Sequence, residues 1–79
     1  MLVQVRKVEK FQGTQQDGTP YRAARVLMIF DDKQTALQTN IFDDVCDPDT
    51  IVPGEIFDMY RAENGRVLIF DKYQKKGEN

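Results

Sequence analysis

Aromatic and basic residues flank a polar segment in the first third of the chain. Lys10 lies before the segment 13–20, and Tyr21, Arg22 and Arg25 come after it. Single-stranded nucleic acid is bound by flat rings that stack on bases and by cations that contact phosphates. These residue types therefore predict a nucleic-acid-binding surface at the margins of this segment.

Further residues of the same two types lie at the ends of later segments. Tyr21 is adjacent to Pro20 at the edge of the polar segment, so we expect its ring to be incompletely buried. We predict that Tyr21 stacks on a base together with Phe30 or Tyr73, whereas phenylalanines are in general expected in the core. The predicted phosphate-binding residues are Lys10, Arg22, Arg25, Arg66 and Lys72. The alternative for the two strand arginines is a solvated position or an ion pair with a nearby acid.

The composition argues against catalysis and metal binding. The chain has no His and one Cys, so it lacks the usual general base and the common zinc ligands. It contains no GxxxxGK[ST], GxSxG or HExxH motif. The aspartates of 43–49 do not have EF-hand spacing and are interpreted as a solvated acidic rim. We therefore predict a non-catalytic protein with no metal and no cofactor.

The net charge of −2 is unevenly distributed along the chain. Residues 31–58 contain eight acids and one base, whereas the remainder contains ten bases and five acids. The acidic character is therefore local. A folded sheet can still present a basic face to a nucleic acid.

Strands are expected to position these residues, because no window has apolar residues at helical spacing with caps at both ends. Val3, Val5 and Val8 change from odd to even spacing, which predicts a bulge. Asn64-Gly65 predicts a tight hairpin, because both central positions tolerate a positive φ. The predicted strands are Leu2–Phe11, Tyr21–Phe30, Thr35–Phe42, Glu55–Arg61 and Arg66–Tyr73.

The segments between the strands decide the expected architecture. Segment 13–20 predicts either a mobile loop or an extended hairpin arm, and the prolines of 43–54 predict an irregular crossing connection. Together these features predict an all-β fold, a five-stranded OB-like β-barrel, with an SH3-like barrel as the alternative. A chain of 79 residues makes one domain, here 1–74, followed by a polar tail, 75–79.

No apolar run is long enough for a membrane span, and the first ten residues lack the apolar core of a secretory signal. We therefore expect a cytoplasmic protein that does not bind membranes.

Three short motifs occur in a characteristic order between about residues 11 and 73. They are Gly18-Thr19-Pro20-Tyr21 after the polar arm, Pro53-Gly54 before the last hairpin, and Asn64-Gly65 followed by the apolar strand Val67–Asp71. In this order the chain resembles the single-stranded-DNA-binding proteins of filamentous phages, of the gene V protein type.

The resemblance implies an OB-like barrel, a symmetric homodimer and sequence-tolerant coating of single strands during DNA replication. The stacking tyrosine of the family corresponds to Tyr21, and a basic residue of its last strand corresponds to Lys72. Three other binding positions of the family fall on Ile29, Asn64 and Gln16, which lack the aromatic or basic character found there.

We therefore predict non-catalytic binding of single-stranded DNA, with RNA as a second possible ligand. For a bacteriophage protein the compartment is the host cytoplasm. One alternative is an OB- or SH3-like module of a phage or mobile element that binds a protein and has no DNA affinity. Another is a protein that mimics DNA with its acidic residues.

Overall fold

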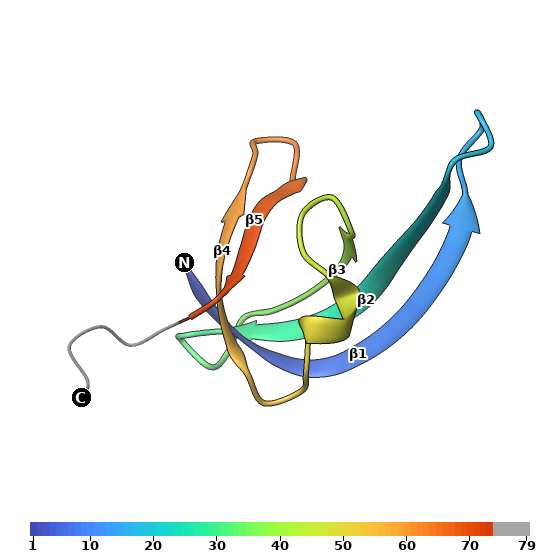
Figure 1. The fold of residues 1–79 in the computed structure, drawn as a ribbon. Helices are drawn as coiled ribbons and strands as arrows, with labels where there is room; N and C mark the ends of the chain where they lie inside the picture. The colour runs from blue at the N-terminus through green and yellow to red at the C-terminus, as the bar shows by residue number, and fades with distance from the viewer. Residues whose placement is uncertain (74–79) are drawn as a thin grey trace.

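The computed structural model describes residues 1–73, which form one antiparallel sheet of five strands (Figure 1). The strands are β1 (Leu2–Thr14), β2 (Pro20–Phe30), β3 (Ala36–Phe42), β4 (Ile56–Arg61) and β5 (Val67–Lys72), and a short 3-10 turn, η1 (Pro48–Thr50), lies between β3 and β4. The prediction of an all-β chain with five strands is confirmed. Residue 74 and the predicted tail 75–79 lie outside the described residues.

The sheet is open. Its strand order is β3-β2-β1-β4-β5, so β3 and β5 form the two edges. Closing the sheet into a barrel would require β3 to pair with β5, and the described residues contain no such pairing. No helix within residues 1–73 has the length and apolar character needed to cross a membrane.

The polar segment after β1 forms the tip of a two-stranded arm. β1 and β2 pair as far as Thr14 and Pro20, so β1 extends beyond the predicted end of the first strand, and the two strands project past β3 and β4 (Figure 1). At the tip the amide of Gly18 donates to the carbonyl of Gln15 at 2.9 Å, and Gly18 has a φ of +90°. Of the two forms predicted for this segment, the structure has the extended hairpin arm.

The predicted hairpin at Asn64-Gly65 is also present, with the same turn as the arm. Gly65 has a φ of +88° and donates to the carbonyl of Ala62 at 2.9 Å, while the amide of Ala62 donates to the carbonyl of Arg66 at 2.8 Å. Asn64 does not adopt a positive φ, and its side-chain oxygen accepts a hydrogen bond from the amide of Arg66 at 2.9 Å. The loop is therefore a turn with a glycine bulge rather than a two-residue turn.

A bulge in β1 brings the valines to one face, as predicted. The pairing of β1 with β2 shifts register between Val5 and Lys7. Val3 and Val5 are buried, and Val8 packs against the same core although its spacing in the sequence differs. The extra residue offsets the change of parity.

The core lies on one face of the sheet around two stacked rings. Phe57 and Phe70 are buried, with centroids 4.4 Å apart and planes at 11°, as expected of core phenylalanines. In β3, Ile41 is buried and Leu37 packs on the core, so these two residues mark the inward face of this strand.

Candidate nucleic-acid interface

Three aromatic rings meet on the solvent face of the sheet, at the base of the arm. Ala23 pairs with Phe11 on one side and with Phe42 on the other, so the three side chains share a face. Tyr21 lies two residues before Ala23 in β2 and points to the same side. The register thus brings together aromatic residues from three strands.

The rings contact each other edge to face. The centroid of Tyr21 is 6.5 Å from that of Phe11, with an interplanar angle of 89°, and 5.7 Å from that of Phe42, with an angle of 62°. The rings cover Ala23, which is fully buried, but Phe42 remains 41% exposed and the other two are partly exposed. Aromatic surface is therefore available to a ligand, in contrast to the stacked pair in the core.

Tyr21 lies across a glycine of the neighbouring strand. Gly13 is the direct partner of Tyr21 in the register, and a Cβ at position 13 would lie 2.6 Å from the Tyr21 hydroxyl oxygen and 2.8 Å from Cζ. A side chain at position 13 would therefore displace the ring.

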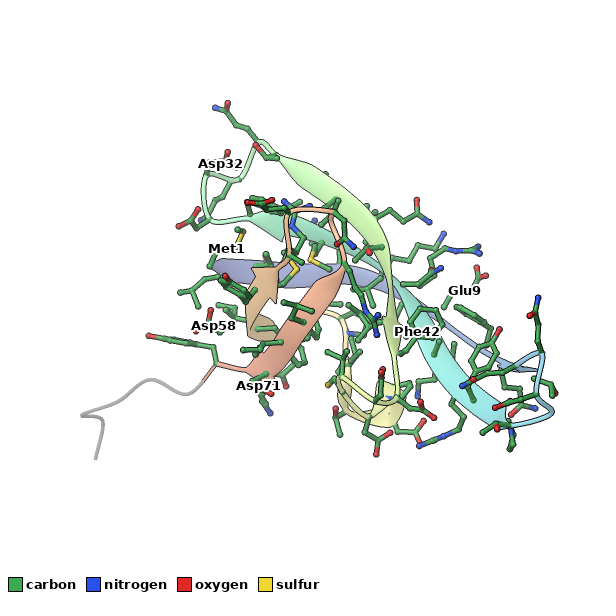
Figure 2. All side chains as sticks on the ribbon, turned by 90° about the horizontal axis from the view of Figure 1, so that it is seen from above. Met1, Glu9, Asp32, Phe42, Asp58 and Asp71 are labelled. Atoms are coloured by element: carbon green, nitrogen blue, oxygen red, sulfur yellow. The ribbon has the colours of Figure 1, made fainter. Side chains whose placement is uncertain are left out.

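Open grooves lie on both sides of Tyr21. A groove of about 790 Å³ is bordered by Tyr21 and Phe42 at the arm and by Asn64 and Arg66 at the β4–β5 hairpin. An adjoining groove of about 710 Å³ is lined by Tyr21 and Arg22. Figure 2 shows Phe42 near the base of the arm. Tyr21 is thus shared by two grooves, one leading to Arg66 and the other to Arg22.

Arg25 lies behind the aromatic rings on the solvent face. Its guanidinium carbon is 5.9 Å from the centroid of Phe11, and it forms an ion pair with Glu9 at 3.4 Å. Lys7 pairs with Leu27, two residues from Arg25, and so extends the same face. Within residues 1–73, Lys7 has no ion-pair partner.

Lys10 and Arg22 lie on the opposite side of the arm, where acidic residues hold them. Arg22 donates to Asp49 at 3.0 Å and to Asp47 at 3.2 Å, and Lys10 lies 3.2 Å from the second carboxylate oxygen of Asp49. The hydrogen bond with Lys10, followed by that with Arg22, lowers the pKa of Asp49. The hydrogen bond with Asp49 and the charge of Asp47 raise the pKa of Arg22.

The other two predicted phosphate-binding residues are also paired. Arg66 is 3.6 Å from Asp44, and Lys72 is 3.4 Å from Glu55. All five predicted cations therefore have an acidic partner, and the ion-pair alternative for Arg22 and Arg25 is confirmed. The basic side chains in these pairs are 48–66% exposed, so solvent and ligands can reach them.

Phe30, Lys72 and Tyr73 do not lie near Tyr21. Val3, at the start of β1, pairs with Phe30 of β2 and with Phe57 of β4. Phe57 in turn pairs with Lys72 of β5. Phe30 and Lys72 therefore lie at the opposite end of the sheet from the arm. Tyr21 and Phe30 are nine residue steps apart along β2, or about 30 Å. Phe30 packs against the core beside Arg61, with 5.8 Å between the guanidinium carbon and the ring centroid. One nucleotide therefore cannot contact both Tyr21 and Phe30.

Phe11, Phe42 and Lys7 are the surface residues that sequence reasoning missed. The first two were expected in the core, but they lie on the solvent face because they flank Ala23 rather than a core residue of β2. The only signal in the sequence that Phe42 faces solvent was its position next to Ile41, because adjacent residues of a strand point to opposite faces of the sheet.

The aspartates of segment 43–55, the acidic connection between β3 and β4, are not grouped as metal ligands in the described structure. Across residues 1–73, no three acidic or cysteine side chains are grouped so that they could hold a metal ion.

Comparisons of the chain with protein-family models, with curated proteins and with solved structures gave no match. The gene V type resemblance therefore rests on the sequence motifs alone.

Proposed function

We propose that this chain binds single-stranded nucleic acid without catalysis, by stacking bases on Tyr21 and Phe42. The observation that carries the proposal is the trio of partly exposed rings on the solvent face, with Tyr21 at the junction of two open grooves. Every base offers a π-face, so such a platform tolerates any sequence. From the resemblance to phage proteins, we further propose that the chain coats single strands during DNA replication.

The proposed path follows the grooves on either side of Tyr21. A base on Tyr21 or Phe42 places the neighbouring phosphates toward Arg66 in one groove and toward Arg22 in the other. Arg25 and Lys7 offer further contacts along the solvent face. The ligand has to compete with the acidic partners of Arg66, Arg22 and Arg25, so the aromatic platform contributes a large share of the affinity.

We also infer that the fold is OB-like. The support is the strand order, which has β1 at the centre and leaves β3 and β5 as the edges that barrel closure would join. The groove between Phe42 and Arg66 lies along the gap between these edges. OB folds are partly open barrels that bind oligonucleotides on one side.

Titration against a fluorescently labelled oligo-dT at several salt concentrations tests the proposed function. Binding is expected at low salt, and the slope of log K against log salt should be about −0.7 for each phosphate contacted. Parallel titration with oligo-U measures the preference for DNA over RNA. Absence of binding at low salt would contradict the proposal.

A homodimer is proposed from exposed apolar side chains at both ends of one face of β4 and β5, on either side of the paired aspartates Asp58 and Asp71. Ile56, Tyr60, Ile69 and Tyr73 are 41–60% exposed, and Tyr60 pairs directly with Ile69. A small sheet gains stability by covering such a surface with a second copy. Light scattering is expected to give the mass of a dimer, and Ile69→Lys should shift the mass toward the monomer. A wild-type mass that stays monomeric at high concentration would contradict the dimer.

The pairing of all five predicted cations favours a second candidate, a protein-binding module. Ion pairs at these positions remove free positive charge from the surface, and the sequence pI is about 4.9. A protein partner does not require a basic surface, whereas a nucleic acid does. The oligo-dT titration separates the two candidates, because only the first one predicts binding.

A further inference from the structure

The acidic connection between β3 and β4 folds back onto the arm and contacts two of its cations. Arg22 bridges Asp47 and Asp49, and Lys10 contacts the free oxygen of Asp49. The backbones of Arg22 and Asp43 are also joined, since the amide of Asp43 donates to the carbonyl of Arg22 at 3.0 Å. Two elements far apart in the sequence are thus held together by charge and by a backbone hydrogen bond.

The core fixes the position of these carboxylates. Pro48 and Ile51 are buried, so the turn that carries Asp47 and Asp49 is anchored to the sheet. The side chain of Asp47 accepts a hydrogen bond from the amide of Asp49 at 3.0 Å. The backbone carbonyl of Asp47 accepts a hydrogen bond from the Thr50 hydroxyl at 2.7 Å. The two carboxylates therefore face Lys10 and Arg22 from a turn that is held by buried residues and by its own hydrogen bonds.

Carboxylate and phosphate oxygens use the same donors. A guanidinium presents its N–H groups in a planar fork that binds either anion, and an ammonium binds both as a point charge. Arg22 lines a groove with Tyr21, and both Arg22 and Lys10 line a neighbouring groove of about 400 Å³ with Asp49. A phosphate that follows a base stacked on Tyr21 would meet donors already occupied by Asp47 and Asp49.

We propose that Asp47 and Asp49 are an internal competitor for the nucleic-acid backbone, an autoinhibitory contact that sets the affinity of the site. This inference rests on the proposed function. Binding exchanges the two carboxylates for phosphates at Arg22 and Lys10, and the exposure of the pairs makes this exchange possible. Because salt weakens the internal pairs as well as the phosphate contacts, the wild-type affinity falls less steeply with salt than it would without the competitor.

The double variant Asp47→Asn/Asp49→Asn tests the competition. Asparagine caps a turn as well as aspartate does, so the turn should be retained, and circular dichroism with thermal unfolding checks this. The affinity for oligo-dT at low salt is expected to rise by roughly tenfold, because two phosphate contacts no longer displace a carboxylate. The salt dependence should become steeper.

A matched control separates the local effect from the change in net charge. Asp31→Asn/Asp71→Asn also removes two negative charges, and neither residue belongs to an ion pair in the described part of the chain. Because Asp71 lies on the proposed dimer face, light scattering has to give this control the same mass as the wild type. Its affinity is expected to rise by no more than about twofold, as for general screening of distant charges. Equal gains in the two variants, or no gain in the first, would overturn the competition while leaving the binding function intact. If none of the three proteins binds oligo-dT, both the function and the competition are wrong.

Discussion

Replacement of Tyr21 by alanine is expected to weaken binding to oligo-dT by about 5-fold to 150-fold, which corresponds to about 1–3 kcal/mol for one stacked base. The reason is the position of the ring, which contacts Phe11 and Phe42 and borders both grooves. Fluorescence titration at low salt measures the loss, and thermal unfolding shows whether the variant is folded.

Two further variants separate stacking from other roles of Tyr21. Tyr21→Phe keeps the ring and should bind within about twofold of the wild type if stacking dominates. Gly13→Ala keeps the tyrosine at position 21 but inserts a methyl group where the hydroxyl end of its ring lies, so the ring must move. We expect an intermediate loss of affinity from Gly13→Ala. An unchanged affinity of a folded Tyr21→Ala variant would assign Tyr21 a purely structural role.

Replacement of Phe70 by alanine is expected to lower the free energy of unfolding by about 3–5 kcal/mol. Phe70 is fully buried and stacks on Phe57, so its removal leaves a cavity in a small core. This loss is a large fraction of the total stability of a domain of this size. Urea denaturation followed by circular dichroism measures it.

A neighbouring residue of the same strand supplies the control. Leu68 is 47% exposed, so Leu68→Ala should change the free energy of unfolding by only about 0.5 kcal/mol. If Phe70→Ala does not fold at all, Phe70→Leu reports the same effect at smaller size. Similar losses for Leu68→Ala and Phe70→Ala would mean that the stacked pair is not the centre of the core.

Local signals in the sequence predicted the strands and turns well. The bulge after Val5 followed from a change in spacing, and the hairpin at Gly65 followed from a residue that adopts a positive φ without strain. These features depend on residues a few positions apart. The predicted turn type was wrong in detail, because the loop is a turn with a glycine bulge in which Gly65, and not Asn64, has a positive φ.

The candidate site was predicted only in part, because its residues come together through pairing between strands. Tyr21 and Arg25 were identified from residue type, and the structure places both on the solvent face of the arm. Phe11 and Phe42 belong to the candidate site because both of them pair with Ala23. The register between three strands cannot be derived from the sequence of any one strand.

The sequence by itself determined that this protein is built from five strands, because alternation of side chains and turn residues act over short distances. It also showed that acidic and basic residues occupy separate parts of the chain. Only the tertiary structure decided that these parts meet, with Arg22 and Lys10 held by Asp47 and Asp49. The physical reason is that attraction between charges acts at a few ångströms, and the folding of the core around Pro48 and Ile51 brings charges from distant segments within that range.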